Sequence, residues 1–143
     1  MGAGPAGLAC AVTAAERGHK VTLYDAASEI GGQFNIAKRI PGKEEFSETL
    51  RYFEVRLKEL NVEVKLDTSL TTQALNQMQV DELVLATGVS PRQLALPGHN
   101  HAKVLNYLEV IKGVNVGPKV AIIGAGGIGF DVAEFLTHGT HEP

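Results

Sequence analysis

The sequence predicts an α/β fold built on a largely parallel sheet, and three observations support this. Segments with strand and helix patterns alternate along the 143 residues, which is typical of this class. The motif GxGxxG, which belongs at a turn from a strand into a helix, occurs twice, at residues 2–7 and at residues 124–129. Residues 83–86 form a continuous apolar run, as expected for a strand that is buried on both faces.

Helical patterns occur in four places. Residues 8–17 are rich in Ala, and Gly18 stands where a glycine commonly ends a helix. In residues 44–60, apolar side chains recur at spacings of four, three, four and three, which indicates an amphipathic helix with one buried stripe. A short helix is expected at residues 107–111 and a longer one at residues 128–136.

Strand patterns fall between these helices. Residues 21–24 form a short apolar run that closes on Asp25, and residues 62–66 alternate between apolar and charged side chains. The run at residues 83–86 and a last run at residues 119–123 complete the set. Residues 90–102 carry prolines and glycine without periodicity, which predicts an ordered linker.

Composition excludes several classes of protein. With 13 basic and 16 acidic residues, the net charge of −3 argues against a nucleic-acid binder, which needs a basic surface. No apolar run approaches the roughly 18–20 residues that span a bilayer. The single cysteine, Cys10, cannot form an internal disulfide and fits a reducing, cytoplasmic location. Because it lies in the Ala-rich helical segment, we expect it to be a small core residue. The histidines lack partners at ligand spacing, so we expect no metal site, and no acid–base pair suggests a catalytic residue.

The glycine motifs predict two sites for dinucleotides. The first glycine permits a tight turn, the second allows the backbone to approach a diphosphate, and the third lets helix and strand pack closely. The diphosphate is then held by amide groups at the positive end of the helix dipole. Asp25, 18 residues beyond Gly7, is placed to accept hydrogen bonds from a ribose. Because its carboxylate would repel a 2′-phosphate, the first site should hold FAD, NAD or ADP. The plainer alternative is that the glycines only make tight turns.

The first motif begins at the second residue, so the strand expected before it is missing. We therefore expect a piece of a longer enzyme. Losing such a central strand removes burial comparable with a domain's net stability. One hypothesis is that residues 120–123, which precede the second motif, fill the vacant position in the sheet.

Further motifs carry a resemblance to a known family. A Gly31-Gly32 doublet follows Asp25, and Leu-Ala-Thr-Gly closes the strand at residues 85–88. This set resembles the flavoproteins with two dinucleotide-binding domains of the Rossmann type. The run Gly-Gly-Gln-Phe-Asn-Ile-Ala-Lys-Arg-Ile-Pro-Gly-Lys-Glu-Glu-Phe, followed by Glu-Thr-Leu-Arg-Tyr-Phe, is similar to the old yellow enzyme-related iron–sulfur flavoproteins, the group of bacterial NADPH-dependent 2,4-dienoyl-CoA reductase.

The resemblance implies a domain division and a set of cofactors. Residues 1–112 would be part of an FAD-binding domain with its crossover linker, and residues 113–143 the start of an NAD(P)H-binding domain. The FMN barrel, the 4Fe–4S cluster and the acyl-CoA site of the family would lie elsewhere in the parent protein. NADPH would reduce FAD, and electrons would pass through the cluster to FMN, which reduces the diene.

The resemblance also implies which residues touch the cofactors. Those expected at FAD are Gly2, Gly4, Gly7, Asp25, Gly32, Gln33, Arg51, Val64, Thr87 and Gly88. Those expected at NAD(P)H are Gly124, Gly126 and Gly129. For Arg51 and Lys43, a solvated surface position is as plausible as a contact with phosphate.

Two alternatives stay open. One is a relative of the amine dehydrogenases, in which the first site binds ADP as a structural ligand. The other is a nucleotide-binding or purely structural module without turnover, which is the expectation for this chain by itself.

Overall fold

The computed structural model describes residues 1–92 and 95–138, which form two compact units. Unit 1 consists of Met1–Asn35 and Glu45–Gly88. Unit 2 consists of Ile36–Glu44 and the chain from Val89 onward. Unit 2 thus combines the second glycine motif and the residues before it with a short excursion of the first half of the chain, Ile36–Glu44. In the described part of the chain, no helix is long and apolar enough to cross a membrane.

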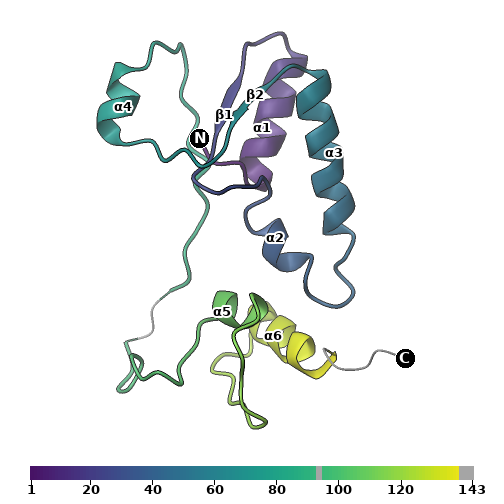
Figure 1. Ribbon diagram of the computed structural model, residues 1–143, viewed down its shortest axis with the longest axis vertical. Helices are drawn as coiled ribbons and strands as arrows, with labels where there is room; N and C mark the ends of the chain where they lie inside the picture. Colours follow the sequence, from purple (N-terminus) through teal and green to yellow (C-terminus); the bar gives the residue numbers. More distant parts are fainter. Residues whose placement is uncertain (93–94, 139–143) are drawn as a thin grey trace. The chain divides into compact units, whose positions relative to one another are not determined.

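Unit 1 places two helices beside a parallel pair of strands (Figure 1). Helix α1 spans Pro5–Glu16 and helix α3 spans Phe46–Glu59. Strand β1, Thr22–Tyr24, pairs with strand β2, Glu63–Lys65, with Leu23 opposite Val64. Helix α1 packs against β1 and against α3. These four elements fall within about three residues of the ranges that the sequence predicts, and they confirm the α/β pattern of the first half.

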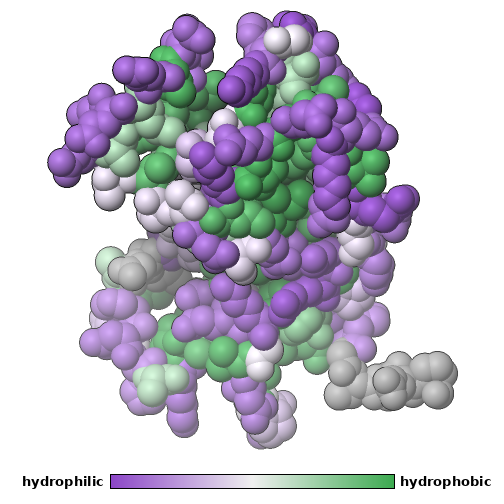
Figure 2. Space-filling view, turned by 45° about the horizontal axis from the view of Figure 1, so that its top comes forward, coloured by the Kyte–Doolittle hydropathy of each residue, from purple (hydrophilic) through white to green (hydrophobic). Residues whose placement is uncertain are grey.

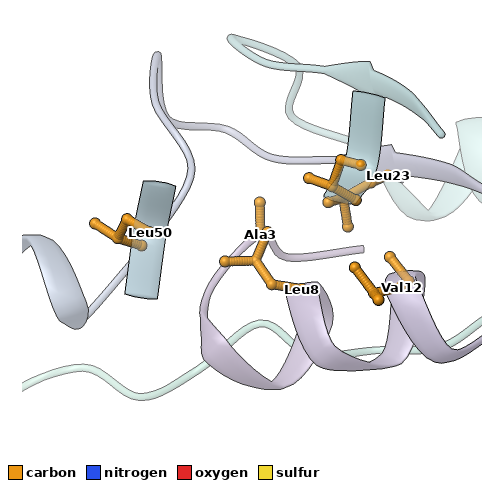
Figure 3. Packing of buried hydrophobic residues seen from close by; sticks show 7 residues of the cluster. Ala3, Leu8, Val12, Leu23 and Leu50 are labelled. Atoms are coloured by element: carbon orange, nitrogen blue, oxygen red, sulfur yellow. The ribbon is translucent and has the colours of Figure 1, made fainter. Parts of the chain in front are cut away.

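The core of unit 1 forms where these elements meet. Ala3 and Leu8 are fully buried, and Leu23 and Leu50 are nearly so. Figure 3 shows Ala3, which belongs to the first glycine motif, together with Leu8 and Val12 of α1, Leu23 of β1 and Leu50 of α3. The stripe of apolar side chains on α3 therefore faces α1 and β1. The first glycine motif therefore contributes Ala3 and Gly7 to the buried part of unit 1.

The first two residues lie where the sequence predicts a strand before the first glycine motif. The Gly2 amide donates to the Tyr24 carbonyl oxygen at 2.8 Å. On the other side, the terminal amine of Met1 donates to the Val84 carbonyl oxygen at 2.7 Å, and the Ala86 amide donates to the Met1 carbonyl oxygen at 2.8 Å. Met1–Gly2 thus lies between β1 and residues 84–86, as the last residues of a central strand would.

The expected strand at residues 83–86 does not form, so this prediction is wrong. Among the residues that the structure describes, Met1 alone forms backbone hydrogen bonds with this run, and one residue is too short a partner to build a ladder. Leu83 and Leu85 are 45% and 63% exposed rather than buried on both faces. The run has the apolar content of a buried strand, but Met1 offers it too little backbone to pair with.

Unit 2 is built around two helices and the excursion from the first half. Helix α5, Tyr107–Ile111, agrees with the prediction and begins with a capping box between Asn106 and Glu109. Helix α6 spans Gly127–His138 and packs against α5. The core residues of unit 2 are Ile40, Val110, Ile111 and Val132. Two short helices complete the described chain: α2, Phe34–Ala37, and α4, Thr72–Gln77.

The expected strand at residues 119–123 is also absent. Val120 and Ile123 are 49% and 72% exposed, and the segment has no regular secondary structure. The hypothesis that residues 120–123 fill the vacant position in the sheet is therefore wrong, because Met1–Gly2 already pairs with Tyr24 there. Figure 2 shows hydrophobic areas at the surface between hydrophilic ones.

Candidate dinucleotide-binding site

The first glycine motif forms a turn that only glycine fits at two of its positions. Gly2 has φ +99°, and a Cβ there would lie 2.2 Å from the Ala86 carbonyl oxygen. A Cβ on Gly7 would lie 1.7 Å from the Gly2 carbonyl oxygen. Such distances are impossible for real Cβ atoms, so the first turn of α1 rests directly on the backbone of Gly2. These contacts account for the first and third glycines of the motif.

The second glycine motif repeats this geometry. Gly124 has φ +120°, and a Cβ on Gly129 would lie 2.3 Å from the Gly124 carbonyl oxygen. Helix α6 begins at Gly127, three residues after the turn starts, just as α1 begins at Pro5 after Gly2. Neither turn lies inside a continuous helix. The two motifs are therefore alike in conformation as well as in sequence.

The second glycine of each motif faces free space instead of protein. The atom nearest to a Cβ on Gly4 is the Gly32 Cα at 3.9 Å, which is an ordinary contact, and a Cβ on Gly126 would meet nothing within 4 Å. Gly4 caps α1 without a side-chain hydrogen bond, and neither α1 nor α6 has an acidic residue in its first turn. Backbone amides at the positive end of each helix are therefore open to an anion. This geometry fits the diphosphate of a dinucleotide.

Asp25 ties the end of β1 to the first glycine turn. One carboxylate oxygen accepts a hydrogen bond from the Ala3 amide at 2.5 Å, and the other accepts one from the Ala27 amide at 2.8 Å. A carboxylate offers about four lone-pair sites, so about two of them stay open for hydroxyl groups. Asp25 can thus hold the turn in shape and still accept hydrogen bonds from the hydroxyl groups of a ribose.

The Gly31-Gly32 doublet lies against the same turn. The Gly31 amide donates to the Ala3 carbonyl oxygen at 2.7 Å. A Cβ on Gly32 would lie 3.0 Å from the Gly4 Cα, and Gly32 has φ +50°. The exposed Gln33 follows directly. The doublet therefore comes within contact distance of the second glycine of the motif, where a bound diphosphate would be expected.

Three further predicted residues lie in unit 1 at different distances from this turn. The Thr87 amide nitrogen would lie 3.2 Å from a Cβ on Gly2, so Thr87 adjoins the turn, and Gly88 follows it with φ +72°. Val64 lies opposite Leu23 in the strand pair and is 36% exposed. The structure thus brings Thr87 to the turn, while Val64 lies along the sheet.

Arg51 lies on the exposed face of α3 and already has an acidic partner. Its guanidinium donates to a Glu48 carboxylate oxygen, with Nη2···Oε2 2.6 Å, and its side chain is 70% exposed. The hydrogen bond from Arg51 to Glu48, together with the charge of Glu48, raises the pKa of Arg51 above its usual value. A solvated ion pair on a helix is the observed role of this residue.

Sequence reasoning missed two residues that shape the site. Ala3, between the first two glycines, uses both its amide and its carbonyl group to hold Asp25 and Gly31. The Asn35 side-chain amide donates to the Ile30 carbonyl oxygen at 2.8 Å and sits where a side chain on Gly31 would lie. No sequence pattern marks Ala3, but an Asn three to four residues after a glycine doublet could have been suspected of closing that turn.

Cys10 corrects another expectation. On an Ala-rich helix it was expected to be a small core residue, but it is exposed. It lines a shallow hollow of about 400 Å³ with Thr13, Arg17 and His19, among others. Because Leu8, Ala11 and Val12 supply the buried face of α1, Cys10 falls on the opposite side.

Comparison with known proteins places this geometry in a family. The family model described as pyridine nucleotide-disulphide oxidoreductase matches residues 1–141. Cinnamate reductase of Clostridium sporogenes is 38% identical over 138 residues, which are 95% of this chain and 20% of that protein. N,N-dimethylglycine/sarcosine dehydrogenase of Chromohalobacter salexigens is 38% identical over 91 residues, 64% of this chain and 13% of that protein.

A solved structure agrees in fold as well as in sequence. The complex of 2-naphthoyl-CoA reductase with 2-naphthoyl-CoA matches with a TM-score of 0.89 and 34% identity, over 94% of this chain and 21% of that chain. This likeness confirms the predicted α/β class. The chain spans about a fifth of the length of cinnamate reductase and of this solved reductase. The chain therefore belongs to the pyridine nucleotide-disulphide oxidoreductase family, whose members are flavin-dependent oxidoreductases that bind FAD and NAD(P)H.

Proposed function

We propose that this chain is the FAD- and NAD(P)H-binding portion of a flavin-dependent reductase. The observation that carries the proposal is the repetition of one backbone geometry: Gly7 rests on the Gly2 carbonyl group as Gly129 rests on that of Gly124. Two such turns in one chain fit a protein that brings two dinucleotides together. We assign residues 1–112 to the FAD-binding part with its crossover, and residues 113–143 to the start of the NAD(P)H-binding part.

The residues of unit 1 have distinct roles in this proposal. Gly2, Gly4 and Gly7 form the diphosphate cradle, and Asp25 accepts the adenosine ribose hydroxyls. Gly32 and Gln33 approach the ribityl–phosphate region, and Thr87 and Gly88 approach the cofactor from residues 83–88. The backbone of Val64 meets the adenine. Arg51 can make its predicted contact with a phosphate only if its ion pair with Glu48 breaks.

In unit 2, Gly124, Gly126 and Gly129 form the cradle for NAD(P)H. FAD, when bound, supplies the flavin ring that accepts a hydride and passes electrons on, so the protein's part is to bind and orient. An enzyme of this kind can therefore work without a catalytic acid–base side chain in this chain. The fold brings the two cofactors together.

For the whole protein we propose NADPH-dependent reduction of a 2,4-dienoyl-CoA in the oxidation of unsaturated fatty acids, with FMN and a 4Fe–4S cluster outside this chain. The run of residues 31–53 supports this interpretation, and so does the similarity to the solved 2-naphthoyl-CoA reductase. A cytoplasmic location is part of the proposal, in keeping with the single cysteine.

Two other outcomes are distinguished by experiment. Similarity to N,N-dimethylglycine/sarcosine dehydrogenase over 91 residues favours, as the second candidate, an amine dehydrogenase relative whose first turn binds ADP. The third candidate is a module that binds a nucleotide without turnover. The flavin-dependent reductase and the amine dehydrogenase relative predict different ligands for the first turn, FAD and ADP. The module without turnover predicts no electron transfer.

The test starts with cofactor retention. The chain is incubated with FAD, passed through a desalting column and examined by absorbance, in parallel with Gly7→Ala and with Gly117→Ala. A Cβ on Gly117 would meet nothing within 4 Å, so it is the matched control. We expect flavin absorbance in the wild type and in Gly117→Ala, but not in Gly7→Ala. Retention of ADP with exclusion of FAD would favour the amine dehydrogenase reading instead.

Turnover is measured next, as NADPH oxidation with added FAD and a dye acceptor. Activity of the chain would rule out the module without turnover. FAD retention without any activity would support that module for this chain and would leave reduction of a dienoyl-CoA to be tested with the whole protein. A chain that retains neither FAD nor ADP would overturn the proposal.

A further inference from the structure

An ion pair in unit 2 joins two segments that are far apart in the sequence. The Lys43 ammonium group lies 2.6 Å from a carboxylate oxygen of Asp131, 88 residues away. Both side chains are partly shielded, with exposed fractions of 38% for Lys43 and 24% for Asp131. Lys43 comes from the excursion Ile36–Glu44, and Asp131 is the fifth residue of α6. The pair therefore links the segment after the Gly31-Gly32 doublet to the helix of the second glycine motif.

Apolar packing fixes the two partners relative to each other. Ile40 is 4% exposed and belongs to the same core cluster as Val132, the neighbour of Asp131. Arg39 donates from its guanidinium to the Ile111 carbonyl oxygen at 3.4 Å. The excursion is thus anchored on both sides of Ile40, by Arg39 and by the ion pair of Lys43. Lys43 is not a loose surface cation that happens to approach a carboxylate.

Asp131 places a negative charge near the start of α6, where the diphosphate of NAD(P)H is proposed to bind. At a rise of about 1.5 Å per residue, it lies about 6 Å along the helix axis from Gly127, where α6 begins. A dinucleotide diphosphate held at the start of α6 carries negative charge of its own. Two such charges roughly 10 Å apart repel with a free energy that corresponds to about a two- to fifteenfold loss in affinity, for effective dielectric constants of about 80 to 20. The Lys43 ammonium group supplies the opposite charge at 2.6 Å from the Asp131 carboxylate.

We propose that Lys43 is a positioning residue that neutralises Asp131 and so allows the second glycine turn to accept the diphosphate of NAD(P)H. The inference rests on the proposed function, since it presupposes a dinucleotide at that turn. It differs from a direct contact between Lys43 and a phosphate, because its effect passes through Asp131. Removing the carboxylate charge should therefore make Lys43 dispensable for binding.

The test measures NADPH affinity by nucleotide fluorescence, without oxygen, in the chain saturated with reduced FAD, which keeps NADPH from the first turn and cannot accept its hydride. The chain has no Trp to interfere. We expect Lys43→Met to weaken NADPH binding about fivefold at low salt, with a smaller effect at high salt. The double variant Lys43→Met/Asp131→Asn should bind within about twofold of the wild type. Lys58→Met, which removes an exposed lysine of α3 in unit 1, is the matched control and should change nothing.

The remaining outcomes separate the possible failures. Wild-type affinity in Lys43→Met, or a double variant as weak as Lys43→Met, would overturn the inference and leave the proposed function standing. A wild-type chain that retains FAD but does not bind NADPH would overturn the second site itself, and the inference with it. If Lys43→Met does not fold, Asp131→Asn alone decides: it should bind NADPH more tightly than the wild type, and weaker binding would contradict the inference.

Discussion

Replacing Gly7 by alanine tests the backbone contact on which the first glycine turn depends. A Cβ at this position would lie 1.7 Å from the Gly2 carbonyl oxygen and 2.9 Å from its carbon. Both partners are backbone, so no side-chain rotation can relieve the overlap. Overpacking of a core commonly costs about 1–3 kcal/mol, and this rigid contact should reach at least the upper end. Alanine recovers about 0.5–1 kcal/mol because it favours the helix over glycine.

The expected net loss for Gly7→Ala is therefore about 2–3 kcal/mol in the free energy of unfolding. For a chain of this size, that corresponds to a fall of roughly 5–10 °C in the unfolding midpoint. Urea denaturation followed by circular dichroism at 222 nm measures the first quantity and a thermal scan the second. Gly117→Ala, whose new methyl group meets no atom within 4 Å, should stay close to the wild type.

Gly4→Ala in the same turn separates stability from binding. Its methyl group would meet only the Gly32 Cα at 3.9 Å, so the loss of a glycine N-cap should cost no more than about 1 kcal/mol. The methyl group would nevertheless occupy the space that the diphosphate needs, and FAD retention should be lost. The reasoning is refuted if Gly7→Ala is as stable as the wild type, or if Gly4→Ala retains FAD like the wild type.

Three further changes have defined outcomes. Asp25→Ala leaves two backbone amides without their acceptor and should cost about 2 kcal/mol in urea denaturation, together with a marked loss of FAD affinity; unchanged stability would show that the carboxylate does not hold the turn. The hydrogen bond from Thr22 and that from Lys65 lower the pKa of Glu63 below its ordinary value, so Glu63 stabilises the fold above its ordinary pKa and this contribution is lost as the pH falls through the lowered value. Glu63→Gln should flatten the acid limb of the thermal midpoint plotted against pH, more so at low salt than at high salt. Asn106→Ala removes the capping box of α5 and should cost about 1 kcal/mol; a probe confined to unit 2, such as amide exchange in α5, should report the change and probes in unit 1 should not.

Much of the fold follows from local patterns in the sequence. The stripe of apolar residues in α3, the Ala-rich run of α1 and the turn signal of Gly18, which has φ +89°, specify their helices without distant partners. The alternation around Val64 predicted the position of β2, although that strand also needs β1 as its partner. The helical features depend on neighbours a few residues away, which the sequence displays directly.

The failures involve partners that the sequence does not display. Residues 83–86 and 119–123 have the apolar content of strands, but a strand forms only where another strand supplies hydrogen bonds. The exposure of Cys10 depends on which face of α1 meets Leu23 and Leu50, and Ala residues on all sides of that helix obscure the answer. The pairing of Lys43 with Asp131 spans 88 residues and has no local signature.

The candidate site was predictable to the extent that backbone geometry determines it. Positive φ at Gly2 and Gly124, and close packing at Gly7 and Gly129, are requirements that no other residue meets, so the motif itself carries them. The second role of Asp25, as acceptor of the Ala3 amide, depends on where β1 ends in space. That position could be known only from the folded chain.

The most direct measurement of the central claim is an amide NMR spectrum of the chain titrated first with FAD and then with NADPH. The account predicts that the amide signals of Gly4 and Gly7 shift on addition of FAD, and that those of Gly126 and Gly129 shift only when NADPH follows. If the signals of both turns stay in place while either nucleotide binds elsewhere, or if neither nucleotide moves any of them, the two turns are not diphosphate cradles.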